Sequence, residues 1–521
     1  MSDEKALTTI HPKGEPETSA EQTPEAALYL DTFDGKIRLR WNTDAKVSSL
    51  GQLAFFIEFL NTSARFEEWV KDCPLTYTSP NAPSKRDVLG TILLSVLSGH
   101  WRYAHMSALR GDGVNPQLLG MTKVASEDSV RRALSALKEE ESEQWLKKHL
   151  KASYEPLLEE PWAMDVDTTV KVLYGHQEDA KVGYNPQKPG RPSHAYHSYF
   201  MGHLRLVMDV EVQAGNQTAS SFAQPELWSL LDGLPKSSHP AFLRGDCGWG
   251  NERAMEGAEQ RKIPYLFKLK QSANVKKLIV KLLGNEQWVD AGQKWEGVDA
   301  ELQLSGWSQS RRVVVLRRAM PQPVEEEKKS KKKTATQLNL DLPQAMYGGV
   351  LYEYSVLVTS LTDEIRTIGQ HYRDRGDSEN NFDELKNQWG WAGFTTHDQK
   401  RCQVMARITA LIYNWWNIFM RLAIPDKHAE AITSRPLALH GIARSTRHSN
   451  QTTVEVTSTH AKAHLIAEAL TKVSGILKQI KETAEQLTDA CRWPLILSTA
   501  FKHFLRGKLL GSAGRLVDAT G

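Results

Sequence analysis

The chain has 521 residues, of which 40% are hydrophobic and 24% charged, values close to those of ordinary globular proteins. Its 34 glycines and 22 prolines are too few for a collagen-like or wholly disordered chain. Lys and Arg number 65 against 62 Asp and Glu, and the net charge of +3 does not by itself indicate a nucleic-acid partner. A chain of this length predicts about three to five domains.

The charge is unevenly distributed along the chain. Residues 1–27 carry six acids and two lysines without an apolar period, which predicts a disordered acidic tail. Residues 421–521 carry 14 Lys or Arg against 8 Asp or Glu, a net charge of +6. A basic helical C-terminal part suits a polyanionic partner. A solvated basic face is the alternative, and charge alone favours it.

The cysteines and the hydropathy indicate a cytoplasmic, soluble protein. Cys73, Cys247, Cys402 and Cys491 are far apart and form no CxxC pair, which speaks against a disulfide framework or a zinc ribbon. The chain opens on polar and acidic residues, unlike a signal peptide. Its longest uncharged apolar runs, such as 408–420, are about 13 residues long, whereas a bilayer span needs about 20.

The first third of the chain is predicted to be helical, with apolar residues recurring every three or four positions. The helices are expected at residues 50–69, 86–100 and 126–137. Ser126 begins a cap-like polar turn, and Arg131 and Arg132 lie early in the third helix. A helix, a turn and an arginine-bearing helix are typical of helix-turn-helix modules, so both arginines are candidate DNA contacts.

The middle of the chain changes to β-branched, alternating patterns. Strands are predicted at 163–172, 199–200, 204–212, 241–243, 264–269 and 352–359, with a hairpin at 301–318. The Gly- and Pro-rich loop 183–194 carries Lys188 and Arg191, which are candidate phosphate contacts. The charged run 325–333 predicts an exposed loop. From Thr362 the chain is predicted to be mostly helical to its end, with a polar interruption at 449–458.

Three acids mark strand ends or helices in this middle part. Asp167 lies in the strand segment DVDTT, two residues after Asp165, and a period of two places both carboxylates on one face. Asp246 follows an apolar strand at a glycine-flanked turn. Glu379 lies in the segment HYRDRGDSENNFDELKNQWG.

The segment around Glu379 predicts one polar helix face. A single helix is expected from an N-cap at Thr362 to Lys386. At about 100° per residue, Tyr372, Arg375, Glu379 and Lys386 fall within roughly a 60° stripe. That face combines a phenol, a guanidinium, a carboxylate and an ammonium.

Metal-dependent phosphoryl transfer explains this mixture of groups. Carboxylate oxygens are the ligands that Mg²⁺ prefers, and paired ions can activate an attacking oxygen and stabilise a leaving one. The cations can hold a DNA backbone, with Arg375 bidentate and Lys386 a point charge. Tyr372 can bond a phosphate or stack on a displaced base.

The spacing Tyr372-x2-Arg375-x3-Glu379-x6-Lys386 resembles, without gaps, the Tyr-x2-Arg-x3-Glu-x6-Lys signature of bacterial insertion-sequence transposases of the cut-and-paste DDE type. The intervals of 79 residues from Asp167 to Asp246 and 133 residues from Asp246 to Glu379 fit the same family. In that family the longer interval holds a β-rich insertion. DVDTTVKVLYGHQE, GYNPQKPGRPSH and VQAGNQTAS further resemble one branch of these transposases. The resemblance covers about residues 40–420.

This resemblance implies a fold and an activity. Asp167, Asp246 and Glu379 are expected to form a metal-binding catalytic triad, with Asp165 as the alternative to Asp167, holding Mg²⁺ that Mn²⁺ can replace. The protein is expected to bind the terminal inverted repeats of its element, cleave there and join the 3′-OH ends to target DNA. It is expected to act as a homodimer in the synaptic complex, in the bacterial cytoplasm at the nucleoid.

The implied architecture is α/β, with an RNase H-like catalytic domain, a β-rich insertion, and helical domains on either side. The expected parts are an acidic tail (1–27), a helical DNA-binding domain (28–155), the two parts of the RNase H-like domain (156–270 and 351–420), the insertion (271–350) and a basic helical domain (421–521). Trp288, Trp295 and Trp307 lie in the insertion, where related transposases stack an aromatic on a flipped base; core packing is the alternative. A decayed or domesticated DNA-binding protein and an RNase H-like nuclease stay open as alternative functions.

Overall fold

The computed structural model describes residues 28–511 with short gaps. It leaves out positions 78, 186–187, 220, 223, 285, 321–345, 348–349, 426–427, 458–460 and 488–490, and the side chains of 346–347, 377–379 and 484–487. The predicted acidic tail and the charged run 325–333 therefore lie outside the described residues. The chain forms two compact units, 1–46 and 47–521. In the first, β1 (Leu28–Thr32) and β2 (Gly35–Leu39) form an antiparallel hairpin that the sequence patterns did not predict.

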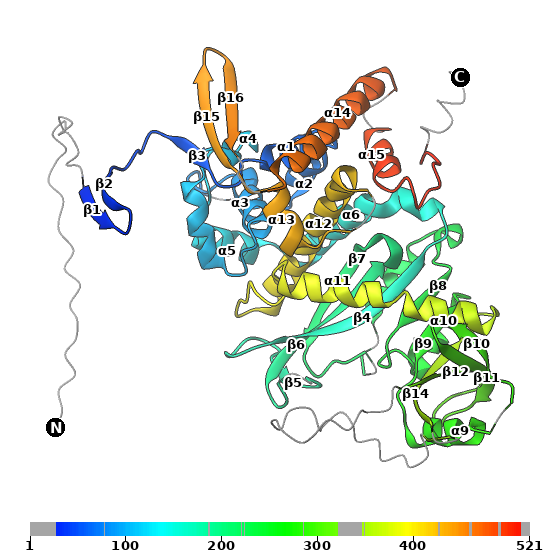
Figure 1. Cartoon of the computed structure of the whole chain (residues 1–521). Helices are drawn as coiled ribbons and strands as arrows, with labels where there is room; N and C mark the ends of the chain where they lie inside the picture. The colour runs from blue at the N-terminus through cyan, green and yellow to red at the C-terminus, as the bar shows by residue number, and fades with distance from the viewer. Residues whose placement is uncertain are drawn as a thin grey trace, which may run out of the picture. The chain divides into compact units, whose positions relative to one another are not determined.

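A large mixed sheet forms the centre of the second unit (Figure 1). Its strands are β4 (Ala163–Val172), β5 (Lys181–Val182), β6 (Pro192–Met201), β7 (Leu206–Ala214), β8 (Phe242–Gly245), β9 (Tyr265–Lys268), β10 (Val289–Gly292), β11 (Trp295–Leu302), β12 (Arg311–Ala319), β13 (Met346–Tyr347) and β14 (Val350–Thr359). The order is β10-β11-β12-β14-β9-β8-β4-β6-β5, with β7 also paired to β6 and β13 to β14. Strands β4, β8 and β9 are parallel, and β6 runs antiparallel to β4.

The β-branched patterns predicted much of this sheet correctly. The predicted strand 163–172 has the bounds of β4, and the predicted hairpin appears as β11 and β12. Strand β14 pairs with β12 on one side and with β9 on the other. The sheet therefore continues without a break from β8 and β9 into the strands that follow.

Helices that are distant in sequence cover the sheet. Helix α12 (Gln399–Ala423) packs against β7 and against α6 (Glu139–Tyr154). Trp415 and Trp416 on α12 are fully or almost fully buried in the core. No helix within the described ranges is long and apolar enough to cross a membrane.

The N-terminal helices differ from the prediction in two ways. They are α1 (Leu53–Thr62), α2 (Arg65–Asp72), α3 (Lys85–Leu97), η1 (Tyr103–Gly111), α4 (Asn115–Leu118) and α5 (Glu127–Ala136). The predicted helix 50–69 is broken at Ala64, whose φ of 56° is left-handed. The helix-turn-helix interpretation is wrong in its connectivity, because η1 and α4 separate α3 from α5. Ser126 caps α5 as predicted, accepting a hydrogen bond from the Ser129 N–H at 3.2 Å.

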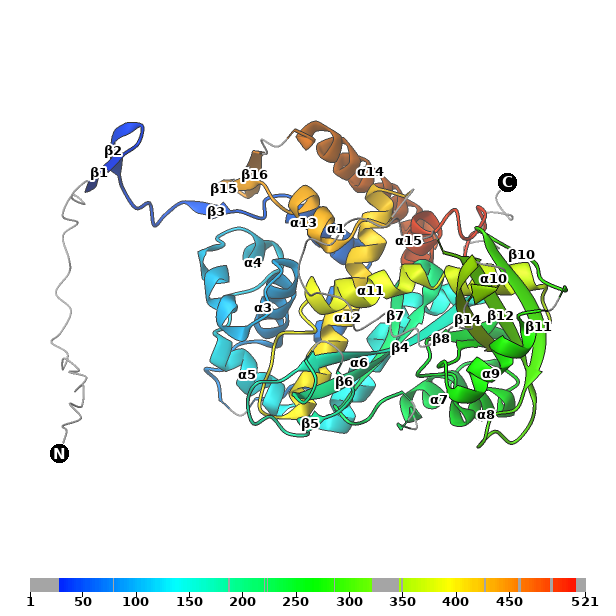
Figure 2. The same cartoon turned by 60° about the horizontal axis from the view of Figure 1, so that its bottom comes forward.

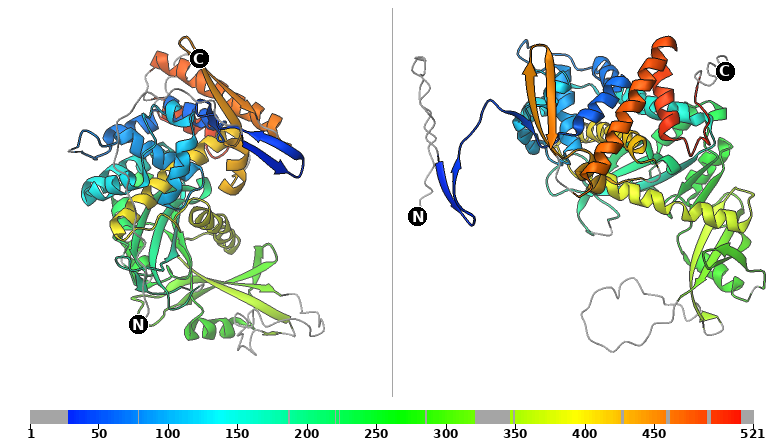
Figure 3. Two further views of the ribbon diagram at one scale, coloured as in Figure 1. Left: turned by 90° about the vertical axis from the view of Figure 1, so that its left-hand side faces the viewer. Right: turned by 45° about the horizontal axis from the view of Figure 1, so that its top comes forward.

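The C-terminal part contains the predicted helices and, between them, a β-hairpin that the sequence patterns did not predict. Its elements are α13 (Ala431–Ala438), β15 (Ile442–His448), β16 (Gln451–Thr457), α14 (Ala463–Leu487) and α15 (Arg492–Ala500). The β15–β16 hairpin, orange in Figure 3, pairs with β3 (Lys46–Ser48) in a separate sheet. The polar interruption predicted at 449–458 is largely strand β16. Its alternating Thr and Val residues suit an extended strand better than a helix.

A buried carboxyl on β7 makes the fold pH-sensitive. Glu211 is 1% exposed and accepts a hydrogen bond from the Tyr199 hydroxyl. Burial, reinforced by the nearby carboxylates of Glu226 and Asp209, raises the pKa of Glu211 to about 8. The folded protein therefore retains a proton at a pH where the unfolded chain has lost it.

We expect Glu211→Gln to flatten the pH dependence of stability. In the wild type the free energy of unfolding contributed by Glu211 falls as the pH rises from the unfolded pKa near 4.5 to about 8. The variant carries no such proton, so its stability relative to wild type should rise by about 1–4 kcal/mol between pH 5 and pH 8.5. Urea unfolding at both pH values measures this difference. A constant difference would contradict the assignment.

Candidate functional site

Two strands of the sheet bring two of the predicted aspartates to neighbouring positions. In the parallel pair β4–β8, Asp165 lies opposite Arg244 and Val166 opposite Gly245. The residues that follow are Asp167 and Asp246, so both occupy the next register position. Asp246 comes directly after the end of β8, as predicted, and its Oδ1 accepts a hydrogen bond from the Gly248 N–H at 2.9 Å.

A buried ion pair lies two residues before these aspartates, on the same face of the two strands. Arg244 donates from Nε to Asp165 Oδ1 at 2.5 Å and from Nη2 to Oδ2 at 2.8 Å. Neither residue is exposed. Nη1 of Arg244 donates to the carbonyl of His371 on α10 (Ile365–Arg373). The pair thus joins β4, β8 and α10, and both oxygens of Asp165 are engaged in it.

Gly202 makes room for this ion pair. A Cβ built on Gly202 would lie 2.2 Å from Asp165 Oδ2 and 3.2 Å from Arg244 Nη2. Because the first contact is shorter than any real van der Waals approach, a larger residue would displace the carboxylate. The sequence around Gly202 gave no signal for this role.

Below the ion pair, the same face of the sheet is apolar and is covered by α10. Ala163 and Phe242 occupy the paired positions before Asp165 and Arg244. They belong to a buried cluster with residues of β9, β12 and β14, capped by Ile368. Tyr372, the first residue of the predicted signature, packs against this cluster. The Tyr372 ring is therefore partly buried against the sheet.

The helix that carries the signature is broken, contrary to the prediction of one helix from Thr362 to Lys386. It forms α10 and α11 (Gly376–Asn387), which follow each other across the sheet in Figures 1 and 2. Asp374 and Arg375 between them have ψ values of −12° and −22°, flatter than those of an α-helix. Helix α10 begins after Glu364, so Thr362 is not its N-cap.

The break places Arg375 against Asp167. Arg375 is 3% exposed, and its Nη2 lies 3.5 Å from Asp167 Oδ1. The Asp167 side chain is 19% exposed, in contrast to the fully buried Asp165. The structure therefore puts a guanidinium beside a partly accessible carboxylate at the edge where β8 ends.

The remaining signature residues lie along α11. Lys386 is half-buried, and burial lowers its pKa while the nearby Asp383 opposes that effect. Phe382 and Leu385 are buried, at 5% and 0% exposure, and anchor the helix. Glu379 is part of α11, but its side chain lies outside the described residues.

The other predicted DNA contacts lie elsewhere in the unit. Lys188 and Arg191 are exposed, and Lys188 Nζ donates to the Tyr174 hydroxyl at 2.7 Å. Arg131 places its guanidinium 5.2 Å from the ring centre of Tyr103. Arg132 is exposed on α5.

Each tryptophan of the predicted insertion is covered by an arginine. The distances from guanidinium to ring centre are 3.9 Å for Arg317 over Trp288, 4.9 Å for Arg318 over Trp295 and 5.5 Å for Arg311 over Trp307. Trp307 is also buried, at 8% exposure. This stacking occupies one face of each ring.

The donor set at the β4–β8 edge suits a hard cation. Asp167 and Asp246 offer carboxylate oxygens, which Mg²⁺ and Mn²⁺ prefer. Among the side chains that the structure describes, no group of three His, Cys, Asp or Glu residues could hold a metal ion. That search did not include the Glu379 side chain.

Sequence comparison assigns the family. The model of the family "Transposase DDE domain group 1" matches residues 45–477, and the chain belongs to this family. No curated protein matches the chain. Among solved structures, the cryo-EM structure of the piggyBac transposase synaptic complex with hairpin DNA matches over 83% of this chain and 82% of that chain. The identity is 9% and the TM-score 0.35, a likeness too weak to transfer any property.

We expect asparagine substitutions at Asp165 and Asp167 to lower the free energy of unfolding by different amounts, because only Asp165 is fully buried. Asp165→Asn leaves the buried Arg244 charge without its counter-ion and should cost about 3–5 kcal/mol of unfolding free energy. Asp167→Asn removes a partly exposed charge from a looser 3.5 Å contact with Arg375 and should cost less, about 1–2 kcal/mol. Urea unfolding of both variants measures the two costs. Equal losses would show that the ion pair does not hold this edge.

Proposed function

We propose that this protein is a DNA transposase that binds the terminal inverted repeats of its mobile element, cleaves DNA there and joins the 3′-OH ends to target DNA. Its family membership supports the class of enzyme. The observation that carries the proposal is the placement of Asp167 and Asp246 at neighbouring register positions, with Arg375 3.5 Å from Asp167. Glu379 follows on the next helix.

We infer that the central strands form an RNase H-like core. The order β7-β6-β4-β8-β9, with β6 antiparallel to its neighbours, corresponds to the order 3-2-1-4-5 of that fold. Strands β10 to β14 come between β9 and α10 in the chain, where a β-rich insertion is expected. The first aspartate then lies on the first strand and the second at the end of the fourth.

The residues that would hold Mg²⁺, or Mn²⁺ in its place, are Asp167, Asp246 and Glu379. When bound, such a cation supplies activation of an attacking oxygen and neutralisation of a leaving one. Asp165 is excluded from this set in our proposal, because Arg244 occupies both of its oxygens. Arg375, with its Nη2 3.5 Å from Asp167 Oδ1, places a positive charge beside this carboxylate. No covalent enzyme–DNA bond is needed, so no nucleophilic side chain is required.

The polar residues of α10 and α11 and the basic C-terminal part would contact the DNA. Arg375, Lys386 and Tyr372 would contact phosphates of the DNA end, since guanidinium, ammonium and phenol are suitable donors. Joining two element ends requires both at once, so a homodimer on DNA is expected. The basic part 421–521 would supply contacts for pairing the ends.

We expect Glu379→Gln to abolish excision, because the amide removes the negative charge of a metal ligand. A marker bracketed by the DNA that flanks the gene is supplied in cells with wild-type or variant protein. Binding of the same ends in a gel-shift assay should be largely unchanged. Excision by the variant at the wild-type rate would contradict the triad.

The same assay separates the alternatives. Binding without excision by wild-type protein would indicate a decayed or domesticated DNA-binding protein. Cleavage of the ends without joining would indicate a nuclease.

Lys386→Ala should weaken DNA binding in a salt-dependent manner. Each neutralised phosphate contributes a slope of about −0.9 to log K against log salt, so the variant should lose about one unit of slope. Titrations at several salt concentrations measure it. Lys262→Ala, at an exposed lysine after α8 (Glu252–Gln260), is the matched control and should keep the wild-type slope. An unchanged slope for Lys386→Ala would remove this residue from the DNA contact.

A further inference from the structure

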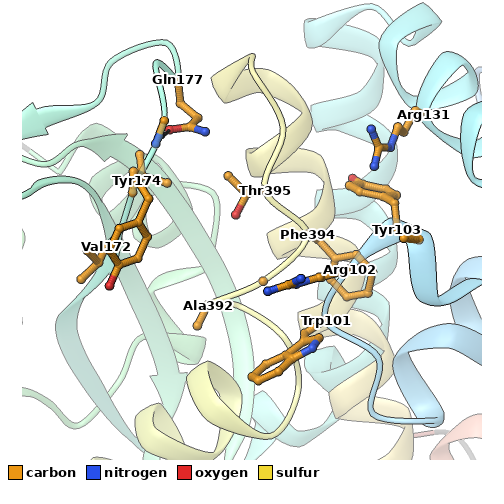
Figure 4. Close-up of a pocket in the computed structure, with 14 residues that line it drawn as sticks. Trp101, Arg102, Tyr103, Arg131, Val172, Tyr174, Gln177, Ala392, Phe394 and Thr395 are labelled. Carbon is orange, nitrogen blue, oxygen red and sulfur yellow. Dashed lines mark hydrogen bonds between the residues drawn. The ribbon is translucent and has the colours of Figure 1, made fainter. Parts of the chain in front are cut away.

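A second concave site lies at the far end of β4 from the paired aspartates. It is a cavity of about 480 Å³, within the range of small-ligand sites (Figure 4). Three segments line it together with Arg131: residues 101–104, residues 172–175 and 177 at the end of β4, and residues 392–395 after α11. The site therefore forms only when the helical N-terminal part packs against the sheet.

Exposed aromatic rings form part of the wall. Trp101 is 53% exposed and Tyr174 is 68% exposed, although such large rings are usually mostly buried. The backbone of Trp101 is held in place, because its carbonyl accepts a hydrogen bond from the Phe394 N–H at 2.5 Å. A Cβ on Gly393 would lie 2.2 Å from that carbonyl, so glycine permits the close approach. The aromatic wall is thus preformed.

The cavity is cationic. Arg102 and Arg131 line it, and none of the lining residues is acidic. Outside the lining, Lys188 Nζ and the Arg191 guanidinium lie 5.3 Å and 5.7 Å from the centre of the Tyr174 ring. An anion that enters the cavity therefore meets positive charge from several sides.

A buried hydroxyl also faces this space. Tyr103 is 2% exposed, and its hydroxyl has no hydrogen-bond partner among the described residues. In Figure 4 that hydroxyl is at the end of Tyr103 that points towards Thr395, another lining residue. A buried hydroxyl without a partner costs free energy, which a bound polar group can recover.

The cavity and the paired aspartates lie along one strand. Val172 follows Asp167 by five residues and Tyr174 by seven, which corresponds to about 17–23 Å at the rise of an extended chain. The same loop that lines the cavity is tied to β4, because Lys171 Nζ donates to the Gly393 carbonyl. Nucleotides of one strand are spaced at about 3.4 Å, so the separation equals about five to seven nucleotides.

We propose that this cavity binds one unpaired nucleotide of the DNA substrate, about five to seven nucleotides from the phosphate that is cleaved. This inference rests on the proposed function. A base within a duplex has no free ring face, whereas an unpaired base can stack on Trp101 or Tyr174 irrespective of its identity. The cations would take the flanking phosphates. Trp101 differs from the insertion tryptophans, because in the described part of the chain no cation lies over its ring, whereas each of theirs is covered by an arginine.

The test is a double-substitution cycle on DNA binding. End duplexes carry a single abasic position, moved one nucleotide at a time through the first ten or so from the cleavage point. Each is titrated with wild type, Trp101→Ala and Tyr174→Ala. Trp41→Ala is the matched control, because Trp41 is 65% exposed and lies in the other unit.

We expect Trp101→Ala to weaken binding of the intact end about 5- to 100-fold. At one or two positions near the fifth to seventh nucleotide, the abasic site and Trp101→Ala together should reduce the binding affinity by no more than either change alone. The Trp41→Ala effect should be independent of the abasic position. Lys188→Ala combined with Arg191→Ala should lower the salt slope by about 2, whereas Trp101→Ala should leave the slope unchanged.

The outcomes separate the two proposals. If the wild type binds and cleaves the ends but the effects of ring and base are additive at every position, the nucleotide site is overturned and the transposase proposal stands. If the wild type neither binds nor cleaves the ends, both proposals fail. Coupling at a single position near the predicted distance supports both.

Discussion

The buried ion pair between Asp165 and Arg244 is the interaction on which the arrangement of this site depends. Removing two charges from water is costly, and the cost is offset only when the geometry is good and the remaining donors are satisfied. Here the contact is bidentate, and the third nitrogen of Arg244 finds the His371 carbonyl. Because the two partners lie on adjacent strands and the carbonyl on α10, the pair fixes the relative positions of all three elements.

Along this face, the paired residues of β4 and β8 change from apolar to charged. The first paired positions hold Ala163 and Phe242, which bury apolar surface under α10. The next hold the ion pair, and the positions after that hold the partly exposed aspartates. Hydrophobic burial therefore anchors one end of the face, and the buried ion pair separates it from the partly exposed aspartates. The backbone at these aspartates is fixed in this way although their carboxylates are not buried.

Local patterns predicted the parts of this site that depend on neighbours in sequence. The bounds of β4 and the position of Asp246 after a strand follow from residue periodicity and turn signals. The break at Arg375 and the β15–β16 hairpin do not follow from local patterns, because tertiary contacts outweigh helix propensity there. The spacing of two residues places Arg244 on the same face as Asp246, but no local pattern indicates its pairing with Asp165. The aromatic cavity joins three distant segments, and no sequence window contains it.

Strand β14 pairs with β9 and with β12 at the same time, so the strands between β9 and α10 extend the central sheet instead of forming a separate lobe. Separating these strands from β9 would break the β14–β9 ladder, including the hydrogen bond from the Leu269 N–H to the Val356 carbonyl at 2.8 Å. These strands are therefore a continuous extension of the central sheet. A molecule that contacts them would be placed relative to Asp167 and Asp246 by the same backbone ladders that join β4, β8, β9 and β14.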